Sequence, residues 1–496
     1  MNSSTMRLRR SLAPSLAAAL SALTLLTLAL LPGSAHAIPA FNRQTGQNCV
    51  ACHAGGQFPE LTPYGRIFKL TGYTIGERAM PISGMAVATS SSVANTSKSP
   101  DPGADFQMKN RPIFATASLL MGGKVTDNIG AFAQVTYDPY AVQSAGGNFS
   151  GHTNADNIDI RYADRFIDDT RDLIVGFSLN NNPSVSDPWN TAAAWMQYVP
   201  VPSPTSSRFV DGNAPYPGYG AGGNIAGLTA YAFWNKTVYA ELGGYATSKG
   251  PLSFMSAGVA NADTTKLQGV NPYWRLAYNR EWGPHSLMLG TSGMIARVYD
   301  DPLDTSDPAT LHRFTDLGVD VQYQYLLDPH SVTAQLVYTS NRHRVPDAAA
   351  NQPVAFVDVN GNALPNTNAV DTNHVLRGKL TYVYQARYGG SVGFFNLTGT
   401  HDTAYLTAGF DPGTLTINPD PAAAAPSLQQ VDGNRTGSPA TNGITLEAFW
   451  MPIQYLRIGV QYTAYGKFNG ASKNYDGFGR NASDNNTIFI YTWLAY

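Results

Sequence analysis

The amino-acid sequence predicts an all-β fold: a transmembrane barrel of about sixteen strands that follows a small helical segment. Apolar and polar residues alternate with a period of two beyond residue 82, short and long connections alternate along the chain, and only 13% of the 496 residues are charged. The 47 glycines and 27 tyrosines suit many strands and turns. A large β-sandwich or propeller is the alternative, but the chain has no repeat of about 40 residues that would form blades.

The alternation separates an apolar face from a polar face. In residues 316–325, Leu317 and Val319 alternate with Asp316 and Asp320. The same rule holds in three further stretches: 376–385, 444–450 and 456–465. In a transmembrane barrel the apolar face meets lipid and the polar face looks into the lumen. We expect the charged lumen residues either to hold a plug by ion pairs or to keep a pore wet: Glu241, Asp316, Asp320, Arg377, Lys379, Glu447 and Arg457.

The connections between the predicted strands alternate in length. Strands are expected to begin near residues 82, 112, 129, 157, 172, 224, 237, 272, 285, 314, 331, 374, 390, 442, 455 and 486. The long connections are expected near 93–111, 139–156, 180–223, 248–271, 301–313, 342–373, 401–441 and 468–485. An even number of strands, with short turns at one end and long loops at the other, is typical of an outer-membrane barrel.

Residues 1–37 are predicted to be a signal peptide. Arg7, Arg9 and Arg10 precede an apolar run over 12–31, and Ala-His-Ala at 35–37 is a small-residue cleavage site, so we expect the mature chain to start at Ile38. A membrane helix is the alternative reading of this run. We expect the mature protein in the outer membrane of a Gram-negative bacterium, against lipid and with its N-terminus in the periplasm. The last strand, 487–496, resembles the assembly signal of outer-membrane barrels.

The two cysteines of the chain, Cys49 and Cys52, are followed at once by His53. C-x-x-C-H is the attachment signature of a c-type haem: the two thiols add to the two vinyl groups, and the imidazole binds the iron as proximal ligand. A redox pair, half of a zinc site and a structural disulfide are the alternatives. No further cysteine exists to complete a zinc site, and no βαβ context surrounds the motif. We therefore predict one covalent haem c.

Residues 38–81 form the predicted plug, and 82–496 form the predicted barrel. Thr62 is expected to cap a short helix that begins at Pro63 and ends before Gly72. Tyr64, Ile67, Phe68 and Thr71 share one face of this helix, which we expect to pack on the haem or on the barrel wall. Arg66 and Lys69 point elsewhere and are candidates for pairing with haem propionates, or else belong to a solvated face. About 44 residues are too few to bury a porphyrin, so we expect the barrel to enclose the plug.

A signal peptide, a single C-x-x-C-H in a short plug and a barrel of about sixteen strands together resemble the fused monohaem cytochrome–porin family. The likeness is most specific in I-P-A-F-x-R-Q-T-G at 38–46 and F-P-x-L-x-x-Y-G-R-x-F-K-x-x-G-Y-T at 58–74. Known members include outer-membrane iron(II) oxidases. The resemblance implies thioether bonds at Cys49 and Cys52, proximal ligation by His53, and electron flow from extracellular Fe²⁺ to a periplasmic c-type cytochrome or another carrier. Family members that do not oxidise iron leave the substrate open, and whether the chain is an Fe²⁺:cytochrome c oxidoreductase stays open with it.

The distal haem ligand is not fixed by the motif. Met80 and Met85 lie downstream of His53 and are both candidates, with a histidine or an open position as alternatives. We expect surface roles for His312, His330, His374 and His401. Four aspartates crowd one predicted loop, Asp300, Asp301, Asp304 and Asp307. They either attract Fe²⁺ or Ca²⁺ or form a solvated acidic loop, and we favour the loop.

The charge excludes one class of partner. A net charge of −2 is no electrostatic footprint for nucleic acid. Three functions remain: electron transfer inward from an extracellular donor, electron export to an extracellular acceptor, and a diffusion porin whose haem plug acts as a gate or redox sensor.

Overall fold

The computed structural model describes residues 39–56, 60–95, 111–143, 149–190, 201, 203–212, 221, 223–257, 265–346, 368–406, 410–411, 416–417, 431 and 433–495. The predicted signal peptide lies outside these residues. Within them, no helix is long and apolar enough to cross a membrane.

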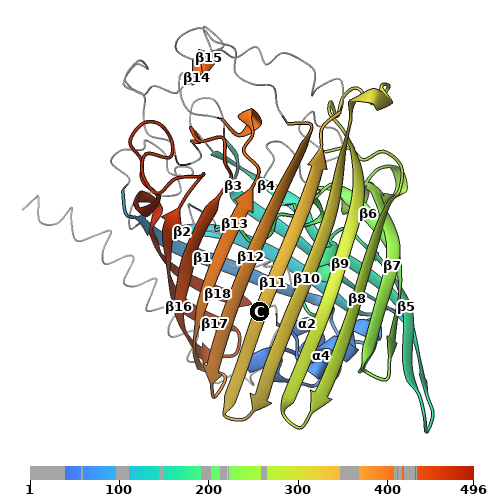
Figure 1. Cartoon of the computed structure of the whole chain (residues 1–496). Coiled ribbons are helices and arrows are strands. Elements are labelled where there is room, and N and C mark those ends of the chain that lie inside the picture. Colours follow the sequence, from blue (N-terminus) through green and yellow to red (C-terminus); the bar gives the residue numbers. More distant parts are fainter. Residues whose placement is uncertain are drawn as a thin grey trace, which may run out of the picture. The chain divides into compact units, whose positions relative to one another are not determined.

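Sixteen antiparallel strands close into a single barrel, as the sequence predicted (Figure 1). The strands of the barrel are β1 (Ile82–Val93), β2 (Ile113–Lys124), β3 (Ile129–Gln143), β4 (Phe149–Ile167), β5 (Asp172–Asn180), β6 (Ile225–Trp234), β7 (Val238–Thr247), β8 (Asn271–Trp282), β9 (His285–Tyr299), β10 (Leu311–Leu327), β11 (His330–Arg344), β12 (Val370–Tyr384), β13 (Tyr388–Gly399), β16 (Thr441–Ile453), β17 (Leu456–Lys467) and β18 (Thr487–Ala495). Each pairs with its neighbour along the chain, and β1 pairs with β18 to close the ring. A separate two-stranded sheet joins β14 (Phe410–Asp411) to β15 (Thr416–Ile417).

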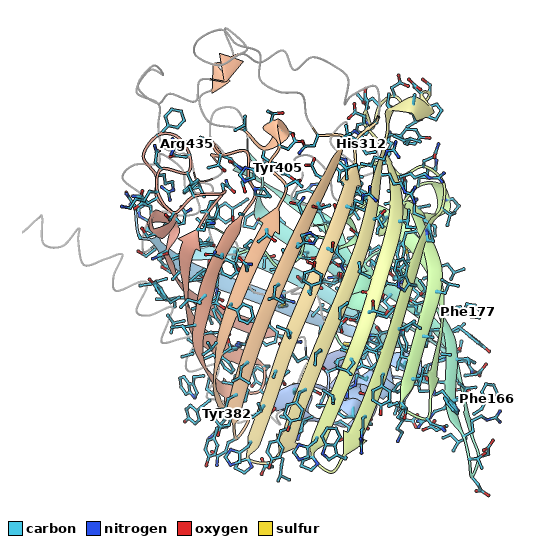
Figure 2. The ribbon with its side chains drawn as sticks, viewed as in Figure 1. Phe166, Phe177, His312, Tyr382, Tyr405 and Arg435 are labelled. Carbon is cyan, nitrogen blue, oxygen red and sulfur yellow. The ribbon has the colours of Figure 1, made fainter. Side chains whose placement is uncertain are left out.

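The two faces of the wall follow the predicted alternation. On β10, Leu317 and Val319 are exposed on the outside, whereas Asp316 and Asp320 are buried on the inside. Large apolar side chains cover the outer face elsewhere, and Phe166 and Phe177 can be followed along its edge in Figure 2. This outward apolar band and buried polar interior make up a transmembrane barrel of the outer-membrane type.

Predicted strand starts agree with the structure to within about four residues, except in one hairpin. We predicted a long connection over 139–156, but β3 runs to Gln143 and β4 starts at Phe149. Polar residues fill this part of the hairpin, where Thr136 pairs with Asn154 and Asp138 pairs with His152. The pairing continues where the apolar alternation has already stopped, so the sequence pattern ended too early.

Short helices fill the space inside the barrel near the short turns. The plug holds α2 (Pro39–Thr45), α3 (Cys49–Cys52), the 3₁₀ turn η1 (Ala54–Gly56) and α4 (Pro63–Leu70). Figure 1 shows α2 and α4 at the end where neighbouring strands are joined by short turns. The remaining short helices are α5 (Pro183–Ser186), η3 (Phe209–Asp211), η4 (Gly250–Met255), η5 (Pro308–Thr310), η6 (Thr403–Tyr405) and η7 (Ala482–Asn485).

The segment between β5 and β6 also turns into the barrel. We call its described residues, 181–190, 201 and 203–212, the lumen segment. Trp189 and Phe209 are fully buried in it. Ser207 Oγ lies 3.1 Å from Thr339 Oγ1 on β11, and the carbonyl of Val201 accepts a hydrogen bond of 2.6 Å from Tyr465 on β17. The lumen segment therefore reaches separate sectors of the wall.

Candidate functional site: the C-x-x-C-H turn inside the barrel

The cysteines begin and end a single helical turn. Cys49 and Cys52 bound α3, and both are present as thiols. His53 follows in extended conformation, and its N–H donates to the carbonyl of Cys49 over 2.8 Å. One turn of helix thus brings the two thiols to one side, and the imidazole leaves the turn directly after them. This is the arrangement that C-x-x-C-H predicts for a c-type haem.

The following segment clamps this turn through its backbone. The Thr62 N–H donates to the Cys52 carbonyl over 2.9 Å, the Ala54 N–H donates to the Glu60 carbonyl over 2.9 Å, and the Thr62 hydroxyl donates to the Ala51 carbonyl. Thr62 also caps α4, because its Oγ1 accepts from the Gly65 N–H over 3.1 Å. The predicted helix start is confirmed, and its capping residue also holds the C-x-x-C-H turn.

Gly65 allows close packing between α4 and α3. A Cβ on Gly65 would overlap the carbonyl oxygen of Cys52, so only glycine lets α4 pass this close to α3. Substitution at this position would separate the thiols from the helix beside them. Gly55, after the motif, packs in the same way against Val383 of β12.

The side chains around the thiols are only partly buried. Cys52, His53, Tyr64 and Ile67 are half-buried. Burial and then the positive charge of Lys69 lower the pKa of His53 to about 4, so its imidazole is neutral at physiological pH and able to bind iron. Burial and then Cys49 raise the pKa of Cys52 to about 11, which argues against an activated thiolate and so against a redox pair. The residues present fit a covalent haem.

Arg66 and Lys69 do not form a solvated face. Arg66 is 1% exposed and donates to the Leu61 carbonyl (2.9 Å), to Gln324 Oε1 (3.1 Å) and to Ser286 Oγ (2.8 Å), with Glu281 3.6 Å away. Lys69 donates to the carbonyls of Val185 and Asp187 in the lumen segment, the latter over 3.2 Å.

The solvated alternative is therefore wrong for both residues. Pairing with haem propionates stays a prediction. The role that the structure assigns them is anchoring, since Arg66 binds the wall and Lys69 binds the lumen segment.

The side chains on the predicted face of α4 pack in different places. Phe68 packs within the plug, with ring centroids 5.0 Å from Phe41 and 5.8 Å from Tyr73. Ile67 packs beside Leu70 and Trp189, and Tyr64 lies near Cys52. The expected enclosure of the plug by the barrel is confirmed, because the Tyr73 hydroxyl donates to Asp159 Oδ2 on β4 over 2.6 Å.

The two methionine candidates lie in different surroundings. Met80 is 67% exposed in the link to β1, and its carbonyl accepts from Arg43 over 3.1 Å. Met85 is half-buried on the lumen side of β1 and packs with Val87 and Trp493.

Hydrogen-bonded neighbours connect Met85 to the motif. Cys49 Sγ lies 3.8 Å from the carbonyl of Gln454, the next residue Tyr455 accepts from the Ala495 N–H over 3.0 Å, and Ala495 is the strand partner of Met85. The distal ligand stays a prediction.

The predicted lumen charges are mostly buried inside the barrel, and they serve three tasks. Lys379 pairs with Glu60 of the plug at 3.6 Å. Glu447 and Arg457 pair with each other at 2.8 Å. Asp320 pairs with Arg275, whose Nε also lies 3.4 Å from Asp187 of the lumen segment. The prediction that they hold a plug is thus right for one pair.

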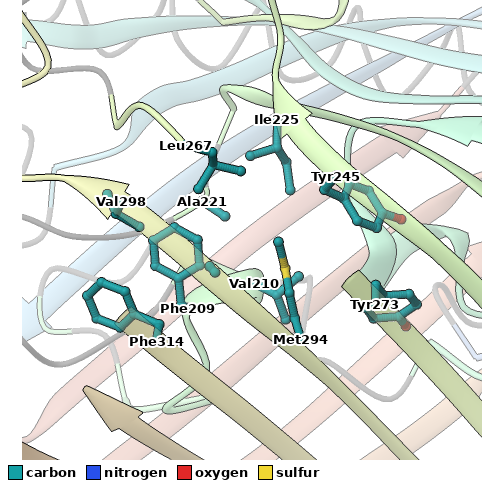
Figure 3. Close-up of a cluster of buried hydrophobic side chains, with 11 residues drawn as sticks. Phe209, Val210, Ala221, Ile225, Tyr245, Leu267, Tyr273, Met294, Val298 and Phe314 are labelled. Atoms are coloured by element: carbon teal, nitrogen blue, oxygen red, sulfur yellow. The ribbon is translucent and has the colours of Figure 1, made fainter. Parts of the chain in front are cut away.

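Asp316 holds the lumen segment rather than the plug. Its two carboxylate oxygens accept the backbone N–H groups of Phe209 and Val210, each over 2.9 Å. The Phe209 ring then stacks on Phe314 at 4.8 Å, within the cluster drawn in Figure 3. Sequence reasoning missed the lumen segment, because its contacts with the wall join it to strands far along the chain, such as Asp316 on β10 and Tyr465 on β17.

The carboxylates of the aspartate loop are engaged by their own backbone. Asp301, Asp304 and Asp307 each accept a backbone N–H two residues on, so each caps its own turn. Among the described residues, no group of three or more His, Cys, Asp or Glu side chains is arranged to hold a metal ion. The preferred interpretation, a solvated acidic loop, agrees with this geometry.

The predicted surface role of His312 is wrong. His312 is 3% exposed and lies 2.8 Å from His343 Nε2 and 3.0 Å from Asp300 Oδ1. β10 begins at Leu311 rather than near 314, which places His312 on the inward side together with Asp316. His330, His374 and His401 keep accessible surface as expected.

Comparison with solved structures finds outer-membrane proteins. No family model and no curated protein matches the chain. Similar solved structures include Salmonella typhi OmpF in complex with daunomycin, with 10% identity, a TM-score of 0.43 and coverage of 84% of this chain and 97% of that chain. OprB of Pseudomonas putida has 10% identity and a TM-score of 0.42, and the match covers 84% of this chain and 94% of that chain. OmpT of Vibrio cholerae has 9% identity and a TM-score of 0.40, and the match covers 84% of this chain and 96% of that chain. The assignment of the barrel is therefore based on the strand pairing within this chain.

Proposed function

We propose that this chain is an electron-transfer protein of a Gram-negative outer membrane, with one covalent haem c attached through Cys49 and Cys52 inside the barrel. The observation that carries the proposal is the position of the C-x-x-C-H turn: it is clamped in a plug that the barrel wall encloses. The haem iron supplies a reversible one-electron couple. The apolar outer face of the barrel supports the location in the membrane, with the plug and short turns toward the periplasm.

The residues of the chain would hold and insulate this group. His53 is neutral and next to the second thiol, which suits the proximal position. Tyr64 and Ile67 offer apolar surface on the same side of the plug. Met85 is the candidate for the distal position, and a thioether there would raise the potential, as oxidation of Fe²⁺ requires.

The proposed electron donor is extracellular Fe²⁺, and the proposed acceptor is a periplasmic c-type cytochrome or another carrier. One haem moves one electron, which suits a one-electron donor better than a two-electron organic substrate. The same arrangement also supports export to an extracellular acceptor. A redox titration of the purified protein, followed by anaerobic addition of Fe²⁺, distinguishes the two directions by the potential of the haem.

A diffusion porin with a haem gate is the second candidate. A barrel of sixteen strands leaves room for an aqueous channel. Against free diffusion, the plug and the lumen segment use wall charges that would otherwise line water. Swelling of proteoliposomes in small sugars separates the two functions. The conduit predicts little swelling at any redox state, whereas a gate predicts swelling that changes when the haem is reduced.

Loss of the haem is the direct test of the cofactor. Cys49→Ser with Cys52→Ser, and separately His53→Ala, should abolish peroxidase staining of the denatured protein on a gel, because covalent attachment is lost. The barrel of the double variant should still show heat-modifiable mobility. Persistent staining in the double cysteine variant would overturn the assignment.

A further inference from the structure

Two carboxyl groups face each other at the end of the barrel that carries the long connections. Asp371 lies near the start of β12, Asp402 lies in the turn after β13, and their exposures are 0% and 5%. One residue joins the two groups, because the Asn368 side-chain amide donates to Asp371 Oδ1 and its backbone N–H donates to Asp402 Oδ2. Tyr405, labelled in Figure 2, marks this end of the barrel. Among the described residues no Lys or Arg forms an ion pair with either group.

The hydrogen bonds around the pair leave one oxygen unaccounted for. Asp371 Oδ1 accepts from Asn368 Nδ2 (3.0 Å) and Thr400 Oγ1 (2.6 Å). Asp402 accepts from the backbone N–H groups of Ala404 and Asn368, each over 2.6 Å. Asp371 Oδ2 is buried and has no donor among the described residues. Two carboxylates at this distance repel, so a positive charge must lie between them, either a proton or a cation.

A third oxygen distinguishes the proton from the cation. Asn373 is 0% exposed and lies two residues beyond Asp371 on the same face of β12. Its Nδ2 donates to the Tyr405 hydroxyl over 2.9 Å, and its Oδ1 is buried against Gly399, next to Thr400, without a donor. A proton shared by the carboxyls satisfies one oxygen pair and leaves the Asn373 oxygen unsatisfied. A metal ion bound by all three residues would satisfy both oxygens, and an unsatisfied buried acceptor is costly.

We infer that Asp371, Asp402 and Asn373 bind a Ca²⁺ ion. The ligand set consists of oxygen atoms, with the Thr400 hydroxyl and the His401 carbonyl close by: the same Asn368 amide donates to Asp371 and to the His401 carbonyl, the latter over 2.6 Å. The His401 ring is turned toward the Thr436 carbonyl and takes no part. Ca²⁺ accepts six to eight oxygen ligands in flexible geometry, whereas Mg²⁺ keeps several waters, which this buried set does not favour.

The ion would join two parts of the rim. Asn368 and Asp371 lead into β12, and Thr400 and Asp402 follow β13, so the site connects the start of one strand to the end of its partner. These are also the bases of two long connections. Ca²⁺ would therefore stabilise the long-loop end of the barrel, and this role does not depend on haem.

Tb³⁺ luminescence tests the site in the purified full-length protein after chelation of calcium. Excitation of tyrosine should sensitise bound Tb³⁺, because Tyr405 bonds the ligand Asn373. Ca²⁺ should displace Tb³⁺, whereas the same concentration of Mg²⁺ should not. Asp371→Asn and Asp402→Asn should each weaken Ca²⁺ binding by about tenfold or more. Asp304→Asn, in a loop that caps its own turn, is the matched control and should bind as the wild type does.

A second measurement keeps the test decisive if one variant folds poorly. Ca²⁺ should raise the thermal unfolding midpoint of the wild type and of Asp304→Asn, but not that of whichever site variant shows heat-modifiable mobility. The inference is overturned if luminescence is insensitive to Ca²⁺, or if the midpoint does not respond to Ca²⁺. It is equally overturned if Asp371→Asn is at least as stable as the wild type in Ca²⁺, since a shared proton would give that result.

Discussion

The plug and the lumen segment fill the same barrel, and each is held both by side chains of its own and by side chains of the wall. The plug carries its own anchors, because Arg66 and Lys69 reach from α4 to oxygen atoms outside it. The lumen segment carries an anchor as well, because Arg208 donates to Ser292 Oγ on β9 over 2.6 Å, and Asp316 on the wall also accepts its backbone N–H groups. The plug could be located from its own motif and from the pattern of its helix. The lumen segment has no such local pattern, and the carboxylate that holds its backbone lies on a distant strand.

The largest effect is expected from removing Arg66, the principal anchor of the plug. Arg66→Ala should lower the free energy of unfolding by roughly 3–5 kcal/mol, since three buried partner groups lose their donor and a cavity remains. Urea titration followed by tryptophan fluorescence measures the change. Arg171→Ala is the control, because its ion pair with Asp168 is half-exposed and should contribute less than about 1 kcal/mol. Equal effects of the two substitutions would contradict the anchoring role.

The second anchor of the plug gives a pH dependence. Burial, and then the charge of Arg161, lower the pKa of Lys69 from 10.5 to about 8. Between these two values the unfolded chain binds more protons than the folded one, so stability rises with pH across this window. The free energy of unfolding of the wild type, relative to that of Lys69→Met, should therefore rise from pH 8 to 10.5 by up to about 3 kcal/mol. A difference that stays flat over this range would mean that the ammonium group is not buried in the folded protein.

The corresponding change on the wall tests the lumen segment. Asp316→Asn should cost about 1–3 kcal/mol, because the amide cannot accept both backbone N–H groups. Limited proteolysis should then cut within the lumen segment, and proteoliposome swelling should rise. Asp304→Asn should change neither. If Asp316→Asn exposes the plug to protease instead, the two fillings are not held separately.

Features that depend on residues close together in the sequence could be predicted, and features that depend on distant residues could not. The haem motif and the cap at Thr62 both depend on residues within about a dozen positions; the structure confirms the cap, and the haem stays a prediction. The barrel wall follows from period-two alternation, which is also local. The partners of Arg66 lie 258 and 220 positions away, so its anchoring role was not visible.

One signal of a filled lumen was present in the sequence. On β18 the inward residues are Phe489, Tyr491 and Trp493, which are almost fully buried although they face the lumen. A wet pore would place polar residues there, as β10 does with Asp316 and Asp320. A strand that is aromatic on its inner face as well as apolar on its outer face predicts an inner filling.

The central claim is that haem in the plug carries electrons through the barrel. Proteoliposomes with oxidised cytochrome c trapped inside and Fe²⁺ added outside, without oxygen and with an iron chelator inside, measure this directly. The wild type should reduce the trapped cytochrome, and the Cys49→Ser, Cys52→Ser double variant should not. Equal reduction by both proteins would show that Fe²⁺ crosses the barrel itself. No reduction by the wild type, with dithionite still able to reduce its haem, would contradict the electron conduit.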